Sequence, residues 1–218
     1  MWIIGDVHGQ FSRLKEIIEE YEQKNSKSSF LQLGDMGIMK EEDLDKLSII
    51  NSNFYLFRGN HDDPFLVQHH PQYLSDYGYD ASRNLFWVGG GLSIDQDNRI
   101  AGRDWWPEEE LSFRELNEVL TNFEQSKPSI VVTHECPETV VSHVSNVHFS
   151  SLAAKYCPSR TAQALQSMFE SHQPDIWVFG HYHVYKEFKV SGTHFVCLDE
   201  LIRGKMSECV YEIPEIDW

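Results

Sequence analysis

Apolar positions along the chain alternate between short continuous runs and runs with helical spacing. Residues 1–4 predict a buried strand, and the apolar positions from Phe11 to Tyr21 recur every three or four residues, which predicts a helix to about Lys24. Later runs predict strands at 30–33, 54–57, 85–88, 92–94, 130–133 and 175–179, helices at about 41–50, 108–124 and 159–172, and a hairpin of 184–190 with 193–198. The segments 63–80 and 135–158 have no clear period and are predicted as loops, the first with one short helix. This alternation favours parallel strands covered by helices, with ligands bound at the carboxyl ends of the strands.

The composition is typical of a soluble globular protein, with 41% apolar and 24% charged residues. At 218 residues, one domain spanning 1–218 is expected. No apolar run approaches the roughly 20 residues needed to cross a bilayer, and no targeting segment is visible, so we expect a cytoplasmic protein. Its four cysteines lie far apart without a C-x-x-C pair, which favours small buried residues in a reducing compartment over disulfides.

The formal net charge of −16 restricts the partners. It makes binding of duplex DNA costly without a basic patch, and none is visible. It also argues against a nuclease on single strands, although short oligonucleotides stay open. Acidic residues gather at 19–22, 41–45 and 108–110, where we expect solvated helix faces and helix starts.

Five short polar segments each follow a predicted strand. They are Gly5-Asp6-Val7-His8-Gly9, Gly34-Asp35, Gly59-Asn60-His61-Asp62, Thr133-His134-Glu135 and Gly180-His181-Tyr182-His183. A lone Gly-Asp turn or a lone histidine is usually structural, but five such segments at rigid strand ends predict one shared site. Mixed histidine and oxygen ligands suit Mn²⁺, Fe or Zn²⁺ better than Ca²⁺ or Mg²⁺. We therefore predict a centre of two divalent metal ions, with manganese as the first choice.

The order of these motifs resembles the calcineurin-like metallophosphoesterase family, over nearly the whole chain from Gly5 to His183. The resemblance implies an α/β fold, a four-layered αββα sandwich of two mixed β-sheets flanked by helices. It also implies a ligand set: Asp6, His8 and His183 for one metal ion, Asn60, His134 and His181 for the other, and Asp35 as the bridge between them.

The expected reaction is hydrolysis of a phosphate ester by a metal-bound hydroxide. Two cations about 3.5 to 4 Å apart polarise a phosphoryl oxygen and lower the pKa of a bound water. By the resemblance, His61 faces the substrate beside Asn60 and protonates the leaving oxygen; the alternative is a histidine that only hydrogen-bonds its neighbours. Asp62 is expected either to orient His61 or to cap the next segment.

The chain departs from the serine/threonine protein phosphatase branch of this family after Asp35. That branch continues as GDxxDRG, whose arginine clamps phosphate and whose last aspartate supports the acid histidine, whereas this chain has Met36-Gly37-Ile38-Met39. Arg58-Gly59-Asn60-His61 otherwise looks like that branch. The departure puts phosphoprotein phosphatase activity in doubt, and a bidentate arginine must come from elsewhere in the chain.

Arg103 is the first candidate for this phosphate clamp. It lies beside Trp105 and Trp106, whose rings could stack on a base. The alternative is that the tryptophans cover an apolar edge of the sheet while Arg103 pairs with the acidic residues that follow. His143 and His148 could line the same cleft, but histidines of this kind are more often ordinary loop residues.

The leading hypothesis is a metal-dependent hydrolase for a phosphomonoester or a small nucleotide-type phosphodiester. The alternative is a serine/threonine-type phosphoprotein phosphatase. A single-strand nuclease is less favoured because of the charge, and a non-catalytic scaffold is less favoured because every ligand is present. The sequence leaves the choice of monoester or diester, and the oligomeric state, open.

Overall fold

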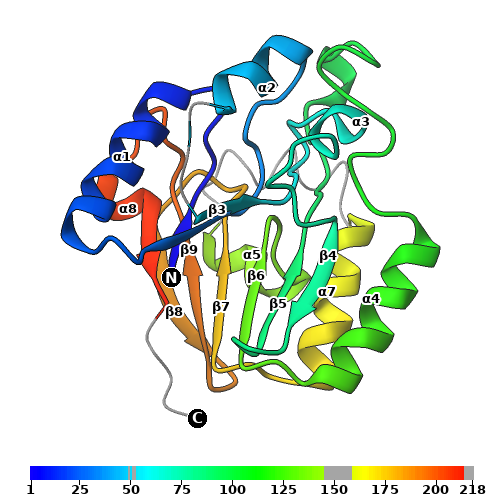
Figure 1. The fold of residues 1–218 in the computed structure, drawn as a ribbon. Helices are drawn as coiled ribbons and strands as arrows, with labels where there is room; N and C mark the ends of the chain where they lie inside the picture. The colour runs from blue at the N-terminus through cyan, green and yellow to red at the C-terminus, as the bar shows by residue number, and fades with distance from the viewer. Residues whose placement is uncertain (49, 51–52, 145–158, 214–218) are drawn as a thin grey trace.

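The computed structural model describes residues 1–48, 50, 53–144 and 159–213, and its strands form two sheets (Figure 1). The smaller sheet has the strand order β10-β1-β2-β3. Its members are β1 (Trp2–Ile4), β2 (Ser29–Gln32), β3 (Asn53–Leu56) and β10 (Val210–Glu212). Strands β1, β2 and β3 are parallel and β10 is antiparallel to β1, so this sheet is mixed.

The larger sheet has the strand order β4-β5-β6-β7-β9-β8. Its members are β4 (Tyr77–Asp80), β5 (Leu85–Val88), β6 (Ile130–Thr133), β7 (Ile176–Phe179), β8 (Lys186–Val190) and β9 (Thr193–Cys197). The four inner strands pair in parallel, and β4 and β8 close the two edges in antiparallel fashion. Every residue of β6 and β7 is buried, which explains why both strands are continuous apolar runs in the sequence.

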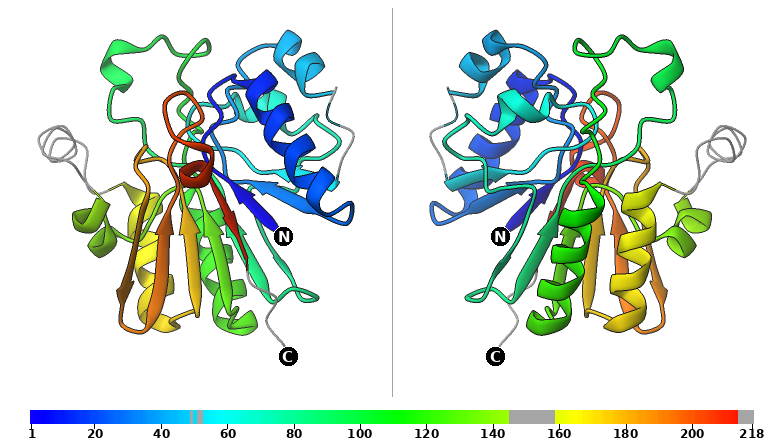
Figure 2. Two further views of the ribbon diagram at one scale, coloured as in Figure 1. Left: turned by 90° about the vertical axis from the view of Figure 1, so that its left-hand side faces the viewer. Right: turned by 90° about the vertical axis from the view of Figure 1, so that its right-hand side faces the viewer.

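Helices cover the outer face of each sheet (Figures 1 and 2). Packed with the smaller sheet are α1 (Phe11–Lys24), α2 (Glu41–Leu47), α3 (Pro64–Val67) and α8 (Met206–Cys209). Packed with the larger sheet are α4 (Phe113–Ser126), α5 (Val141–Val144) and α7 (Arg160–Ser171). Two short 3₁₀ helices, η1 (Gln96–Asn98) and η2 (Glu138–Val140), lie in connecting segments.

Three groups of buried apolar side chains hold the four layers together. Leu14 belongs to the group under α1, Val132 to the group between the two sheets, and Phe123 to the group under α4 and α7. Burial of one such side chain stabilises a fold by about 1.5–3 kcal/mol. The predicted four-layered αββα sandwich of two mixed sheets is confirmed.

The segment between β5 and α4 differs most from the prediction. A strand predicted at 92–94 is wrong, because this segment forms a loop in which the backbone N–H of Ser93 donates to the carboxylate of Glu109 instead of to a strand. The helix predicted from 108 begins at Phe113, where the side chain of Ser112 caps it in a capping box with Glu115. The acidic run before it is solvated only at Glu108, since Glu109 and Glu110 are buried.

Two strands lie outside the predicted ones. Strand β4 falls within the segment predicted as a loop, where its sequence Tyr-Gly-Tyr-Asp carries no apolar run, and β10 pairs with β1 near the end of the chain. Three of the cysteines, Cys136, Cys197 and Cys209, are free and buried as predicted, while Cys157 lies outside the described residues. Among the described helices, none has the length and apolarity required to cross a membrane.

Candidate metal centre

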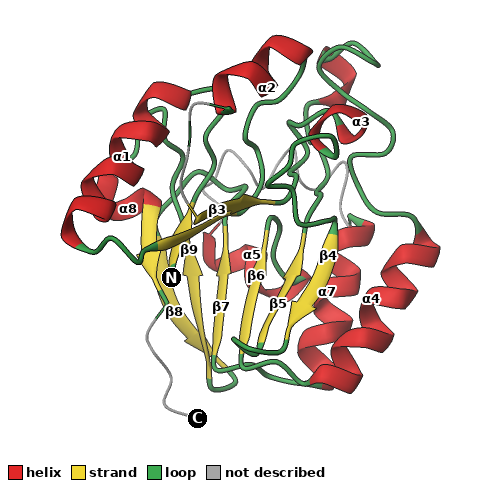
Figure 3. Cartoon of the chain, in the orientation of Figure 1, coloured by secondary structure: helices red, strands yellow, loops and turns green. Residues whose placement is uncertain are grey.

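The five polar segments lie together at one end of the sandwich, because each follows the carboxyl end of a parallel strand. Figure 3 shows the connecting loops crowded at this end. The strands and the residues that follow them are β1 with Asp6 and His8, β2 with Asp35, β3 with Asn60, β6 with His134, and β7 with His181 and His183. The two sheets therefore contribute to one site, although their strands are far apart in the sequence.

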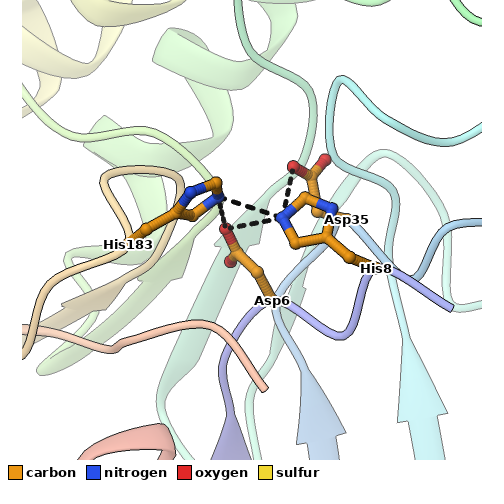
Figure 4. Close-up of side chains that lie close together, drawn as sticks. All are labelled: Asp6, His8, Asp35 and His183. Carbon is orange, nitrogen blue, oxygen red and sulfur yellow. Dashed lines mark hydrogen bonds and ion pairs between the residues drawn. The ribbon is translucent and has the colours of Figure 1, made fainter. Parts of the chain in front are cut away.

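The first group of donors consists of Asp6, His8, Asp35 and His183 (Figure 4). One donor atom from each residue lies within 4.8 Å of the others. The Nε2 atoms of His8 and His183 are 3.0 Å apart, and His183 Nε2 lies 3.2 Å from Asp6 Oδ2. Imidazole nitrogens and carboxylate oxygens turned toward one point form a ligand set for a divalent transition-metal ion.

The second group consists of Asn60, His134 and His181. Asn60 Oδ1 lies 2.9 Å from His134 Nε2 and 3.0 Å from His181 Nδ1. The other ring nitrogen of His134, Nδ1, lies 3.0 Å from the carbonyl oxygen of Leu33, which orients the ring and leaves Nε2 for a metal. Burial lowers the pKa of His181 to about 3, so this ring is neutral, the form in which an imidazole binds a metal ion.

Asp35 faces both groups of donors. Its Oδ1 lies 3.3 Å from His134 Nε2, and its Oδ2 lies 3.7 Å from His8 Nε2. Asp35 Oδ2 is buried with no hydrogen-bond partner among the described residues, a costly state that a cation would relieve. Burial by itself raises the pKa of Asp35, but His134, His61 and His8 hold it well below its ordinary value, so the carboxylate is ionised. These residues fit two metal ions with Asp35 between them.

Four of the predicted ligand residues have left-handed backbone conformations. The φ angles are 47° for His8, 55° for Asp35, 69° for His181 and 50° for His183. Each such residue costs about 1–2 kcal/mol, and such strain concentrates at functional sites. The flanking glycine at 59 also admits the close approach of the ligands, because a Cβ there would overlap Asp35 Oδ1.

Comparison with known proteins agrees with this geometry. A family model described as calcineurin-like phosphoesterase matches residues 1–185. The chain belongs to this family. It is therefore a hydrolase of phosphate esters that depends on metal ions. A search of curated proteins finds no sequence match.

Solved structures of low sequence identity share the fold of this phosphoesterase. The phosphopantetheinyl hydrolase of Mycobacterium tuberculosis aligns over 99% of this chain and 95% of its own, with a TM-score of 0.61 and 15% identity. A putative 5'-nucleotidase of Staphylococcus aureus aligns over 91% of this chain but 48% of its own, with a TM-score of 0.52 and 13% identity. An anchor protein of the inner membrane complex of Plasmodium aligns over 90% and 70%, with a TM-score of 0.50 and 7% identity.

A cavity of about 350 Å³ lies over the donor groups of the phosphoesterase. Asp35, Asn60 and His61 line it, and so do the cationic side chains of Arg99 and Arg203. Its apolar lining consists of aliphatic side chains, Leu92, Ile94 and Ile202. The cavity thus combines metal ligands and two cationic side chains in a space suited to a small anionic substrate.

Arg99 is one of the two cationic residues of the cavity, and no motif in the sequence indicated it. Two of its guanidinium nitrogens lie 2.8 Å from Nδ1 and 3.1 Å from Nε2 of His61. Arg99 is held by Asp95, whose Oδ1 lies 2.6 Å from its Nε, and by the carbonyl oxygen of Asp104. Burial lowers the pKa of His61. The negative charge of Asp35 raises it in part, whereas the positive charge of Arg99 lowers it further. The negative charge of a bound phosphate would raise the pKa of His61 again.

Arg103 does not reach the donors. Its side chain is 66% exposed, its guanidinium pairs with Asp104 at 2.8 Å, and it is not among the described residues that line the cavity. Trp106 is buried and is not among the described residues that line the cavity, so its ring is not placed to stack on a base there. His143 stacks on Phe188 at 4.8 Å between ring centroids, away from the cavity, and His148 lies outside the described residues.

Asp62 has neither of the two roles expected for it. Its carboxylate accepts hydrogen bonds from the backbone N–H groups of Met36, Gly37, Ile38 and Gly59, at 2.8–3.2 Å. The cap of the next segment is Asp63, whose side chain accepts from the first turn of α3. Asp62 therefore ties the loop after Asp35 to the loop before Asn60, and it positions these two predicted ligands without being among the described residues that line the cavity.

Glu200 is a second residue that no sequence signal indicated. It is 4% exposed, and its Oε2 lies 3.7 Å from His183 Nδ1 and 3.9 Å from His8 Nε2. A carboxylate beside the ring nitrogen of a metal-binding histidine fixes the ring and makes it a better ligand. It follows no motif, because it reaches the site from the segment after β9.

A measurable pH effect arises at Glu109, because burial raises the pKa of this carboxyl to about 7. The folded state then holds a proton that the unfolded chain releases above pH 4.5, so stability falls as pH rises from about 4.5 to about 7. The free energy of unfolding should fall by roughly 3 kcal/mol over this range, since a shift of one pKa unit corresponds to about 1.4 kcal/mol. Urea unfolding of the EDTA-treated protein and of Glu109→Gln should show wild type losing stability relative to the variant over this range. A difference that does not vary with pH would contradict the shift.

Proposed function

We propose that this chain hydrolyses a small phosphate ester, a phosphomonoester or a nucleotide-type phosphodiester, with two manganese ions held by the two donor groups. The observation that carries the proposal is the cavity of about 350 Å³, in which Asp35, His61 and Arg99 converge. When bound, two such ions polarise the phosphoryl oxygens and make a bound water acidic. The chain's own residues must then hold the phosphate and release the alcohol.

Arg99 is suited to bind the phosphoryl oxygens. Its planar guanidinium donates two parallel hydrogen bonds, and in this structure two of its nitrogens face His61 rather than a carboxylate. Arg99 takes the place that the sequence analysis gave to Arg103, and it supplies the arginine that is missing after Asp35.

His61 is suited to protonate the leaving oxygen. Its backbone N–H donates to Asp35 Oδ1 at 2.7 Å, and its Nε2 lies 3.9 Å from Asp35 Oδ2, so the ring borders the space between the donor groups. As water forms its bond to phosphorus and loses a proton to solvent, the ester bond breaks and the departing oxygen takes a proton from the protonated ring of His61. Asn60, which binds a metal ion and lines the cavity, borders the same substrate.

The proposal is tested with paired substrates. The protein, treated with EDTA and then supplied with Mn²⁺, Fe²⁺ or Zn²⁺, is assayed on p-nitrophenyl phosphate, bis-p-nitrophenyl phosphate and a phosphoserine peptide. We expect hydrolysis of at least one small ester, greatest with Mn²⁺, and loss of at least about 100-fold in EDTA that Mn²⁺ restores. Binding of two ions without hydrolysis of any ester would contradict the proposal and favour a scaffold. Preference for the peptide would favour a phosphoprotein phosphatase.

A further inference from the structure

The side-chain amide of Asn60 has two ends that differ in their effect on a cation. Its oxygen is a metal ligand, whereas its NH₂ group carries only donors and repels a metal ion. Asn60 Oδ1 faces His134 and His181, so the amide is oriented correctly for binding. Neither histidine can impose this orientation once its lone pair is directed at a metal ion, so another group must hold the NH₂ end.

We propose that Glu109 holds Asn60 in its metal-binding orientation, acting through Ser93. Asn60 Nδ2 donates to Ser93 Oγ at 2.9 Å. The Ser93 hydroxyl in turn donates to Glu109 Oε2 at 2.5 Å, and the backbone N–H of Ser93 donates to Glu109 Oε1 at 2.9 Å. This inference rests on the proposed role of Asn60 as a ligand of the second metal ion.

The Glu109 carboxylate sets the direction of the two hydrogen bonds that connect it, through the Ser93 hydroxyl, to Asn60. A hydroxyl can donate or accept, so a serine alone would hold either end of the amide. At pH 8 the Glu109 carboxylate is ionised and only accepts hydrogen bonds. It therefore accepts the hydrogen bond of the Ser93 hydroxyl, whose oxygen is left to accept from Asn60. The NH₂ end of the amide then points to Ser93, and the oxygen must point to the donors.

Burial makes this direction strict. Asn60, Ser93 and Glu109 are 1%, 2% and 2% exposed, so water does not compete for their hydrogen bonds. A reversed amide would leave a buried donor or acceptor unpaired, at a cost of about 1–3 kcal/mol. The main chain at Glu109 is fixed as well, because the buried Arg58 donates to its carbonyl oxygen at 2.7 Å. The loop between β5 and α4 thus positions a ligand that follows β3 in the other sheet.

Glu110 provides a matched control for Glu109. It is also buried, but its Oε1 accepts from the backbone N–H of Thr161 at 2.9 Å and from the Thr161 hydroxyl at 3.0 Å, with no hydrogen bond to Asn60 or Ser93 among the described residues. Loss of this carboxylate should lower the stability of the fold without changing the orientation of the amide.

The test is a calorimetric titration of the EDTA-treated protein with MnCl₂ at pH 8, without substrate. Ser93→Ala and Glu109→Gln should each weaken binding of the second ion about 10- to 100-fold and leave the first ion within about threefold. In the double variant, Glu109→Gln should weaken binding of the second ion by less than about threefold beyond the loss caused by Ser93→Ala alone. Glu110→Gln should change neither affinity by more than about threefold. Because no substrate is present, a failure of hydrolysis does not affect this result.

A second variant separates orientation from general damage to the fold. Asn60→Asp replaces the amide by a group whose two ends are both oxygen, so its orientation no longer matters. In that background, Ser93→Ala should cost less than about threefold in affinity for the second ion. An equal loss in both backgrounds, equal weakening of both ions, or unchanged binding in Ser93→Ala would overturn the proposal.

Discussion

Asp35→Asn should reduce kcat/KM for the preferred ester at least about 1,000-fold, or about 4 kcal/mol at 1.36 kcal/mol per tenfold. Each carboxylate oxygen of Asp35 faces a different donor group, and one of them has no hydrogen-bond partner among the described residues. The amide removes the negative charge between the two ions and turns an NH₂ group toward one of them. The variant therefore loses both the correct placement of the two ions and the carboxylate charge that they share.

The measurement combines steady-state kinetics with metal titration of the same preparation. Asp35→Asn should bind the weaker ion at least about tenfold less tightly than wild type. Asp45→Asn, an exposed carboxylate on α2, is the matched control and should retain wild-type rates. Retention of full activity by Asp35→Asn would exclude the two-ion arrangement, and a thermal unfolding curve confirms that the variant is folded.

The candidate ligands, which the structure brings together, could be found from the sequence because each is tied to a local pattern. A buried apolar run followed by glycine and a polar residue predicts the end of a parallel strand, and the ends of such strands meet at one edge of a sheet. The grouping of Asp6 with His183, 177 positions later, needed the resemblance, since spacing alone does not pair the strands of two different sheets. The left-handed backbones of His8 and Asp35 have no signal in the sequence.

The residues around the ligands were not predictable, because they depend on the path of the loop between β5 and α4. That path is set by contacts distant in sequence: Ser93 with Glu109, and Arg58 with the carbonyl oxygen of Glu109. Acidic residues just before a helix are ordinarily exposed to solvent. Glu109 is nevertheless buried, and it accepts a hydrogen bond from Ser93, the residue to which Asn60 donates. The same path brings Arg99, rather than Arg103, to the cavity.

Arg99→Ala should lower kcat/KM about 30- to 100-fold, while Arg103→Ala should stay within about twofold of wild type. Hydrogen bonds to charged groups contribute about 1.5–3 kcal/mol, and about 1.4 kcal/mol corresponds to a tenfold change. Arg99 lines the cavity and faces His61, whereas Arg103 is two-thirds exposed and paired with Asp104. Both substitutions remove one positive charge from the same loop. A difference between them therefore reports the contact that Arg99 makes in the cavity and not the change in net charge.

Arg99→Lys refines the comparison. Lysine keeps the charge but presents a single ammonium instead of a planar pair of donors, so it should recover only part of the loss. The affinities for Mn²⁺ should be unchanged in all three variants, because Arg99 contacts His61 and not a metal ligand. A larger loss in Arg103→Ala than in Arg99→Ala would assign the phosphate clamp to Arg103. Equal small losses would mean that neither of these arginines is the clamp, and that the phosphate is held by the metal ions, by His61 or by Arg203, which also lines the cavity.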